Sequence, residues 1–423
     1  MKKVQLFIVG AGNRGFAYAE YARMHPEQAV ITGVAEPRDY YRNKMAAEHN
    51  IPPEHVFKDW REAVDKEKFA DAVIIATQDT QHTDPAVTFS EKGYHMLLEK
   101  PMSTRPEECR KITSTVLKNN TIFAVCHVLR YTNYTQRLKE IIASGAIGRI
   151  VSMQHLEPVG YWHHAHSFVR GNWRKENEAS FMLLAKSCHD IDWIQYIMDS
   201  RCTAVSSFGS LMHFRQENKP AKAADRCTEC GCEPECPYSA KKIYLSRAQE
   251  GNFEWPLDTI TSDLTVAGIE KAIETGPYGR CVYACDNDVV DHQVVDMRFE
   301  NETTVTFTMT AFTEMCDRRT RIFGTKGELY GDGKSIEYYD FLTNQRHKEN
   351  VSALDGDISS GHGGGDYNLM KNFVTAVAQN DRSRILSGPT ETLESHTLIF
   401  AAEKARIENC VVSIPCLDVP DLL

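Results

Sequence analysis

Residues 4–15 read VQLFIVGAGNRG, a mostly apolar run that leads into Gly10, Gly12 and Gly15. A run of this kind that ends at a glycine is typical of a strand buried on both faces of a sheet. We expect a helix to follow, from about Asn13 to Met24. Glycines at this spacing between a strand and a helix let backbone N–H groups approach a pyrophosphate, so the stretch predicts a dinucleotide-binding loop rather than a turn without a ligand.

The acidic residue that accompanies such a loop is also present. A second strand is predicted at residues 30–35, and Glu36 stands at its end, 21 residues beyond Gly15. A carboxylate there can accept hydrogen bonds from both hydroxyls of a ribose and would repel a 2′-phosphate. The sequence therefore favours NAD over NADP, although Arg38, two residues further on, leaves NADP as an alternative.

The rest of the chain predicts two units of different architecture. Further strands at residues 71–76, 94–98 and 121–125, separated by helical patterns, indicate an α/β unit with a doubly wound parallel sheet over residues 1–130. Residues 131–423 predict a second α/β unit with a largely antiparallel open sheet and a Cys-rich insertion near residues 215–245. Its strands are expected at 149–159, 203–211, 289–299, 303–311, 319–323 and 336–341, and one unbroken helix is expected at 181–198.

Composition and charge exclude several classes of protein. Hydrophobic residues make up 42% and charged residues 25% of the 423 residues, as in globular proteins, and the net charge is −10. An acidic chain is not expected to bind nucleic acid or anionic lipid through its overall charge. No apolar run approaches the roughly 20 residues that cross a bilayer, and the N-terminal run has no signal-peptide cleavage site. We therefore expect a cytoplasmic protein.

Two short stretches carry residues suited to proton transfer. Lys100 follows Glu99 at the end of a predicted strand, on the sheet edge where the glycine loop lies, so it is a candidate acid or base. The alternative is a solvated lysine paired with Glu99. Lys186, His189 and Asp192 are three residues apart in turn, so they can share one face of the predicted helix.

Residues 161–174 read YWHHAHSFVRGNWR, in which aromatic and polar side chains alternate. Aromatic rings stack on the C–H surfaces of sugars, while His and Arg bind hydroxyl groups. Three histidines in four residues are also compatible with a metal, but neither a carboxylate nor a fixed helical spacing supports one. The sequence therefore predicts a sugar or polyol site formed by Arg130, Tyr161, Trp162, His163, Arg170, Trp173 and His362.

Four cysteines, Cys227, Cys230, Cys232 and Cys236, lie within ten residues of one another. Four thiolates in one short segment can bind a tetrahedral zinc ion, so structural zinc is one interpretation. Reduced thiols without a metal are a second, and an iron–sulfur cluster is a third. Disulfides are disfavoured in the cytoplasm, and four thiolate ligands would leave no open position for catalysis.

Taken together, the motifs resemble the Gfo/Idh/MocA oxidoreductase family. The resemblance spans nearly the whole chain and is carried by the glycine loop, Glu99-Lys100-Pro101, residues 76–79 with His82, residues 130–148, and His189 with Asp192. It implies a Rossmann domain followed by a C-terminal α/β domain, assembly into a homo-oligomer, and hydride transfer between nicotinamide and a hydroxyl of a sugar, glycoside or cyclic polyol. By this resemblance Lys100 moves the hydroxyl proton and His189 contacts the same hydroxyl. The implied cofactor residues are Gly10, Gly12, Asn13, Arg14, Gly15, Glu36, Thr77, Asp79, His82, Glu99 and Lys100.

One position departs from the pattern of that family. The aspartate expected four residues before the active-site histidine is Ala185 here, and the neighbouring Lys186 is a candidate to supply a charged group. Segments 162–174 and 361–366 also resemble the NAD-dependent N-acetylgalactosaminidases, which oxidise a sugar transiently and return the cofactor unchanged. The main prediction is a net oxidoreductase, with a glycosidase that uses NAD cyclically and a non-catalytic NAD-sensing regulator as alternatives.

Overall fold

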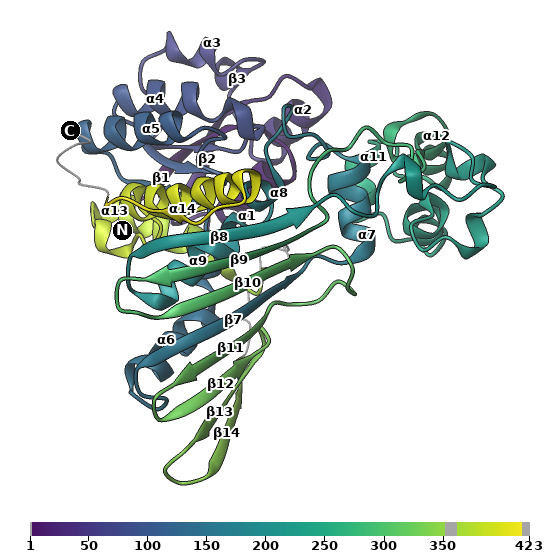
Figure 1. Ribbon diagram of the computed structural model, residues 1–423. Coiled ribbons are helices and arrows are strands. Elements are labelled where there is room, and N and C mark those ends of the chain that lie inside the picture. Colours follow the sequence, from purple (N-terminus) through teal and green to yellow (C-terminus); the bar gives the residue numbers. More distant parts are fainter. Residues whose placement is uncertain (1, 352–361, 417–423) are drawn as a thin grey trace.

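The computed structural model describes residues 2–351 and 362–416, so residue 361 of the segment named above lies outside the described residues. Two sheets with helices packed on them form the molecule, and a lobe of short helices projects from one side (Figure 1). This arrangement confirms the predicted α/β class and the predicted difference between the two halves.

A six-stranded sheet forms the N-terminal part, and all its strand pairs are parallel, in the order β3-β2-β1-β4-β5-β6. This is the doubly wound order of the Rossmann fold. The strands are β1 (Val4–Val9), β2 (Ala29–Ala35), β3 (Val56–Phe57), β4 (Ala72–Ile75), β5 (His95–Leu98) and β6 (Phe123–Val125). The helices are α1 (Asn13–Met24), α2 (Asp39–Glu48), α3 (Arg61–Val64), α4 (Thr83–Glu91) and α5 (Pro106–Lys118).

Strand β1 is buried on both faces, as its composition predicts. Leu6 and Ile8 belong to one apolar cluster, and Phe7 and Val9 belong to another on the opposite side of the sheet. Each of the four is at most 1% exposed. The sequence did not predict β3, because a strand of two residues carries no periodicity to detect.

The second sheet has nine strands in the order β14-β13-β12-β11-β7-β10-β9-β8-β15, and only the pair β7–β10 is parallel among its described strands. The strands are β7 (Ile150–Pro158), β8 (Cys202–Ser210), β9 (His292–Phe299), β10 (Thr304–Thr310), β11 (Arg319–Gly324), β12 (Gly327–Gly331), β13 (Ser335–Asp340), β14 (Gln345–Asn350) and β15 (Val412–Ser413). Strands β12, β14 and β15 are additional to the predicted set. The largely antiparallel open sheet is confirmed.

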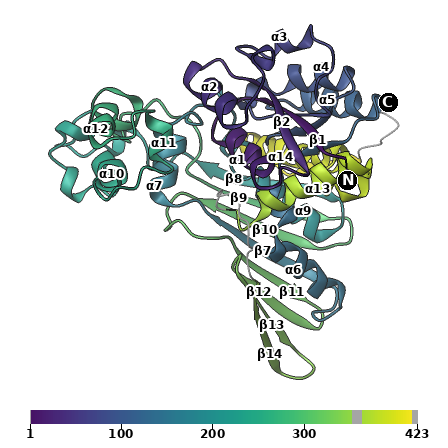
Figure 2. The ribbon, with the colours of Figure 1, turned by 180° about the vertical axis from the view of Figure 1, so that it is seen from behind.

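Helices cover one face of this sheet. They include α6 (Asn133–Ala143), α9 (Cys188–Met198) and α14 (Pro389–Glu408), whose apolar residues share a cluster with those of β7 to β10. Strand β10 shows the resulting alternation, with Val305 and Phe307 buried and Thr304 and Thr306 exposed. Figure 2, from behind, shows these helices lying against the sheet.

The segment between β8 and β9 forms the projecting lobe (Figures 1 and 2). It contains α10 (Ser246–Gln249), α11 (Leu257–Ile260) and α12 (Val266–Thr275). Tyr244, Leu257 and Ile269 are fully buried in an apolar cluster of its own. The insertion is therefore longer than the segment 215–245 that the sequence predicts, and we call it the lobe below.

The C-terminal helices return to the parallel sheet. Leu369 and Phe373 of α13 (Gly365–Gln379) are buried in the same cluster as Leu6 and Ile8 of β1. The division of the chain at residue 130 stays a prediction. Within the described residues, no helix combines the length and the apolar character that crossing a membrane requires.

Candidate active site

The glycine loop and Glu36 lie together at the carboxyl end of β1 and β2. Gly10 has φ +96°, and a Cβ on it would lie 2.5 Å from the carbonyl oxygen of Ala76, so only glycine fits there. A Cβ on Gly12 would meet only Arg38, at 3.6 Å, so the space above Gly12 is open. This open cradle at the N-terminus of α1 suits a pyrophosphate.

Glu36 is 2% exposed and is held as an acceptor. Its Oε2 accepts from the backbone N–H of Ala11 at 2.9 Å, and its Oε1 accepts from the backbone N–H and the Nε of Arg38 at 3.0 and 2.7 Å. Burial alone would raise the pKa of Glu36, but the hydrogen bonds from Arg38 outweigh it and lower the pKa. The side chain is therefore a carboxylate, as binding of ribose hydroxyls requires.

Residues after β4 occupy the same edge. Asp79 is buried and accepts a hydrogen bond from Nε1 of Trp173 at 3.1 Å. His82 is fully buried, with its Nδ1 2.7 Å from the carbonyl oxygen of Pro101. The contact between Asp79 and Trp173 joins a predicted cofactor residue to a predicted substrate residue.

Glu99 is part of a buried ionic cluster that the sequence did not predict. Its Oε1 accepts from Nε of Arg14 and from the hydroxyl of Tyr18, both at 2.6 Å. The Arg14 guanidinium also pairs with Asp366 at the start of α13. Burial opposes ionisation of Asp366, but Arg14 and His362 hold the pKa of this carboxyl far below its usual range. Asp366 in turn lies 2.8 Å from Nδ1 of His362.

Lys100 contacts the segment that precedes His189. The Nζ of Lys100 donates to the carbonyl oxygen of Ala185 at 2.8 Å, so this lysine is not the solvated partner of Glu99. His189 is 6% exposed, and its ring centroid lies 5.7 Å from that of His362. Burial, followed by the charge of Lys100, holds the pKa of His189 well below its usual range. Its imidazole is therefore neutral near pH 7.

The predicted unbroken helix over residues 181–198 is wrong. The segment forms α8 (Met182–Ala185) and α9, with Lys186 and Ser187 between them, so Lys186 and His189 do not share a face of one helix. The Nζ of Lys186 lies 3.4 Å from Glu157, whose other oxygen is 2.9 Å from Nε of Arg318. Burial lowers the pKa of Lys186, against the opposing effect of Glu157.

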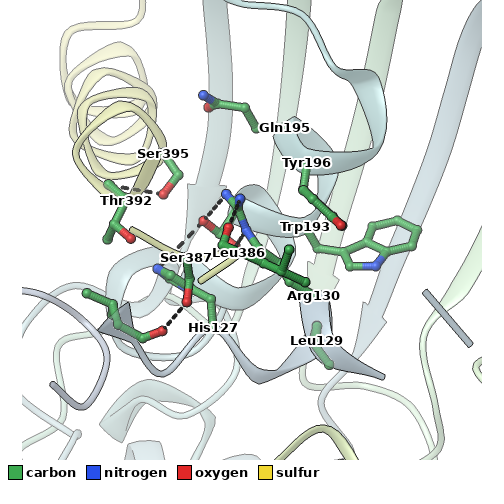
Figure 3. A network of polar contacts seen from close by, with 12 residues as sticks. His127, Leu129, Arg130, Trp193, Gln195, Tyr196, Leu386, Ser387, Thr392 and Ser395 are labelled. Carbon is green, nitrogen blue, oxygen red and sulfur yellow. Dashed lines mark hydrogen bonds and ion pairs between the residues drawn. The ribbon is translucent and has the colours of Figure 1, made fainter. Parts of the chain in front are cut away.

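Arg130 and Asp192 form an internal ion pair. Arg130 is 3% exposed, and its Nε and Nη2 donate to the two oxygens of Asp192 at 2.7 Å each. Its Nη1 donates to the carbonyl oxygen of Leu386, also at 2.7 Å (Figure 3). All three nitrogens of the guanidinium are engaged, so Arg130 holds α9 against the loop before α14. Its expected contact with substrate stays a prediction.

The predicted aromatic segment contains α7 (Tyr161–His164) and the turn that follows it. Trp162 lies between the Arg247 guanidinium, 4.2 Å from its ring, and Trp255, 5.2 Å away. Tyr161 is 38% exposed. Burial, followed by the charge of Lys186, holds the pKa of His163 well below its usual range. Arg170 is 1% exposed and donates to the carbonyl oxygens of Arg280 and Tyr238, so it holds the lobe together, and its expected contact with substrate stays a prediction.

The structure does not support the predicted zinc site. Within residues 2–351 and 362–416, no three His, Cys, Asp or Glu side chains are grouped so that they could hold a metal ion. Cys227 packs into the core of the lobe, while Cys236 packs against a different cluster that includes Phe214 and Tyr238. These two thiols therefore pack in different clusters, although they are close in sequence.

Several buried polar atoms without a hydrogen-bond partner follow β4 and β6 or come shortly after Ala185, which Lys100 contacts. Within the described part of the chain they include Oγ1 of Thr77, both ring nitrogens of His127, Oγ of Ser187 and Nδ1 of His189. Buried polar groups are normally satisfied, so such a group of them indicates a place for a polar ligand. The set fits the amide of a nicotinamide and a reacting hydroxyl. His127 was missed by the sequence analysis, although it follows β6 as Lys100 follows β5.

A parallel sheet in the order 3-2-1-4-5-6, an open glycine cradle and a buried carboxylate at the end of β2 are typical of a dinucleotide-binding protein. The chain belongs to the Gfo/Idh/MocA family. Residues 4–127 match the oxidoreductase family's NAD-binding Rossmann fold, and residues 139–414 match its C-terminal alpha/beta domain. The family is therefore confirmed, as are the Rossmann fold and the class of enzyme.

Individual relatives are distant. The YteT protein of Bacillus subtilis (strain 168) is 22% identical over 336 residues, 75% of each chain. The 2,7-anhydro-N-acetylneuraminate hydratase of Escherichia coli (strain K12) is 26% identical over 202 residues, 48% of this chain and 51% of that one. A solved levoglucosan dehydrogenase in complex with NADH and L-sorbose is 17% identical and shares the fold, with a TM-score of 0.72 over 99% of this chain and 100% of that chain.

Proposed function

We propose that the chain transfers a hydride between NAD and a carbinol carbon of a sugar, glycoside or cyclic polyol. The observation that carries the proposal is the hydrogen bond of 2.8 Å from Lys100 to Ala185, four residues before His189, because it brings the charge of Lys100 to bear on that histidine. NAD, when bound, supplies the hydride acceptor or donor. The candidate residues for binding it are the glycine loop with Asn13 and Arg14, together with Glu36, Thr77, Asp79, His82, Glu99 and Lys100.

In this proposal Lys100 and His189 both hydrogen-bond to the reacting hydroxyl and take part in the transfer of its proton. The neutral imidazole of His189 can accept a hydrogen bond, and burial is what keeps it neutral. The ammonium of Lys100 can donate one. Lys186 supplies a charged group, of opposite sign, next to the position where Ala185 replaces the family's aspartate, and Glu157, itself paired with Arg318, holds it in place.

The substrate class is supported by the aromatic segment and by the names of relatives. Tyr161 and Trp173 offer ring faces for the C–H surfaces of a sugar, Trp162 supports the segment through Arg247 and Trp255, and His163 and His362 offer nitrogens for the hydroxyls. The relatives include a scyllo-inositol 2-dehydrogenase (NAD(+)) of Bacillus subtilis (strain 168). Cyclic compounds with several hydroxyl groups are therefore the first candidates.

The test is NADH fluorescence from protein and NAD⁺ with levoglucosan, myo-inositol, scyllo-inositol, free sugars and alkyl glycosides. We expect a sustained rise with one class of compound. Lys100→Met should abolish it and keep NADH affinity within a few-fold, whereas Lys111→Met, on the exposed side of α5, should leave it unchanged. Turnover retained in Lys100→Met would refute the role of Lys100.

A second candidate function is a cyclic, redox-neutral reaction. His362, positioned by Asp366 and 5.7 Å from His189, adds a further acid or base beside the hydride-transfer pair. Such a group suits proton removal next to a transient carbonyl, as elimination and hydration require. Consumption of 2,7-anhydro-N-acetylneuraminate or release of nitrophenol from a nitrophenyl glycoside, without net NADH, would favour this reaction over net oxidation.

We also propose a homo-oligomer that forms through the face of the nine-stranded sheet opposite α6, α9 and α14. This face carries exposed residues of β10 such as Thr304 and Thr306. Size-exclusion chromatography with in-line light scattering measures the mass of the assembly directly. Thr306→Arg should shift this mass toward that of a single chain. A monomeric wild-type protein at micromolar concentration would refute the proposal.

A further inference from the structure

One residue of the lobe reaches the glycine loop. Asp258, in α11, accepts a hydrogen bond through Oδ2 from Nδ2 of Asn13, at 3.4 Å. Asn13 is the first residue of α1, directly after the open cradle at Gly12. In Figures 1 and 2, α11 lies on the side of the lobe that faces α1 and α2.

The position of Asp258 is well determined by its neighbours. Leu257 is fully buried in the lobe's core, and Oγ1 of Thr259 lies 3.3 Å from Nε2 of His166. Trp255, three residues earlier, packs 5.2 Å from Trp162 and 5.0 Å from His163. The segment 255–260 therefore joins the candidate substrate residues to the glycine loop, and the lobe's core holds it there.

The second carboxylate oxygen of Asp258 has no protein partner. Its Oδ1 is buried and, among the described residues, has no hydrogen-bond donor. A carboxylate only accepts hydrogen bonds, and so do the oxygens of a pyrophosphate at neutral pH. A dinucleotide bound over Gly12 can satisfy this oxygen only through its ribose hydroxyls, which are the donors that flank its pyrophosphate.

We propose that Asp258 is a cofactor-binding residue contributed by the lobe. Its Oδ1 accepts from a ribose hydroxyl of NAD while its Oδ2 keeps the bond to Asn13, so the lobe closes over the pyrophosphate and slows cofactor release. The inference rests on the dinucleotide binding of the family and not on the sugar chemistry proposed above. In this proposal the lobe determines how long the cofactor stays bound between turnovers.

The test measures NADH release without any sugar. Protein loaded with NADH is mixed in a stopped-flow instrument with a large excess of NAD⁺, and the fluorescence decay gives the dissociation rate constant. Asp258→Ala loses both hydrogen bonds and should release NADH about tenfold faster. Glu250→Ala removes an exposed carboxylate from the same lobe and should release it at the wild-type rate.

Asp258→Asn tests whether the side chain at this position accepts or donates the hydrogen bond. The amide keeps one acceptor oxygen, so this variant should release NADH faster than wild type and more slowly than Asp258→Ala. Release from Asp258→Asn at the wild-type rate would mean that the carboxyl donates to a phosphate, and would overturn the proposal. So would release from a folded Asp258→Ala at the wild-type rate. Because Asp258→Asn is isosteric, it remains informative if the alanine variant is unstable.

Discussion

Removing Arg130 should destabilise the fold far more than removing an arginine from a surface ion pair. Arg130 and Asp192 are 3% and 0% exposed, and three hydrogen bonds of 2.7 Å hold the guanidinium. Arg130→Met fills similar space but leaves the carboxylate of Asp192 buried with no charged partner. Breaking a buried pair in this way costs about 3–5 kcal/mol of unfolding free energy.

The assay is urea-induced unfolding at pH 8 and at pH 5.5, monitored by tryptophan fluorescence. Without Arg130 the pKa of Asp192 rises above its value in the unfolded chain, so protonation relieves the cost and the difference from wild type shrinks at pH 5.5. The double variant Arg130→Met with Asp192→Leu removes both charges and should recover most of the loss.

The control is Arg346→Met. Its pair with Glu337 is also short, at 2.8 Å, but its side chain is 65% exposed, so we expect a change of less than about 1 kcal/mol. If Arg130→Met costs no more than this control, or if the double variant is less stable than the single one, the pair does not have the structural role inferred here.

Three further predictions follow from single positions. Gly12→Ala should keep the melting temperature and weaken NADH binding at least tenfold, because its methyl group fills the open cradle. Gly10→Ala should lower the melting temperature, because its Cβ would lie 2.5 Å from Ala76. Calorimetry measures the melting temperatures, and fluorescence titration measures the NADH affinity. Glu36→Ala frees Arg38 from its hydrogen bond of 2.7 Å and should raise NADP⁺ affinity relative to NAD⁺, and an unchanged ratio would contradict the role of Glu36. Burial lowers the pKa of His164 to about 4, below about 6.5 in an unfolded chain, so the unfolded state binds the proton first and stability falls as pH drops from 6.5 to 4. His164→Leu should reduce that fall by up to about 2 kcal/mol in urea titrations at pH 7.5 and 5.

The local part of the fold could be predicted from the sequence. Strand β1, the glycine loop and α1 are contiguous, and their pattern carries both the geometry and the ligand class. Glu36 and Lys100 could be placed because each directly follows a strand of a parallel sheet, and all such positions meet at one edge. The same rule would have found His127.

Long-range pairings could not be predicted in this way. Whether Arg130 faces substrate or Asp192 depends on how α9 packs, and no local sequence pattern predicts that packing. The break between α8 and α9 was missed because residues 181–198 keep a helical apolar pattern through Lys186. The close spacing of the cysteines indicated a shared ligand, but Cys227 and Cys236 pack into two different apolar clusters.

The ion pair between Arg14 and Asp366 has a consequence for synthesis of the chain. The two residues are 352 positions apart, and Leu369 and Phe373, just beyond Asp366, complete the apolar cluster beneath β1. A ribosome therefore releases the first half of the chain with its glycine loop formed from local sequence, but with Arg14 lacking one of its two carboxylate partners and one side of the sheet uncovered. Until α13 emerges, that apolar surface is open to chaperones, and the second partner of Arg14 is supplied only after residue 366 has been made.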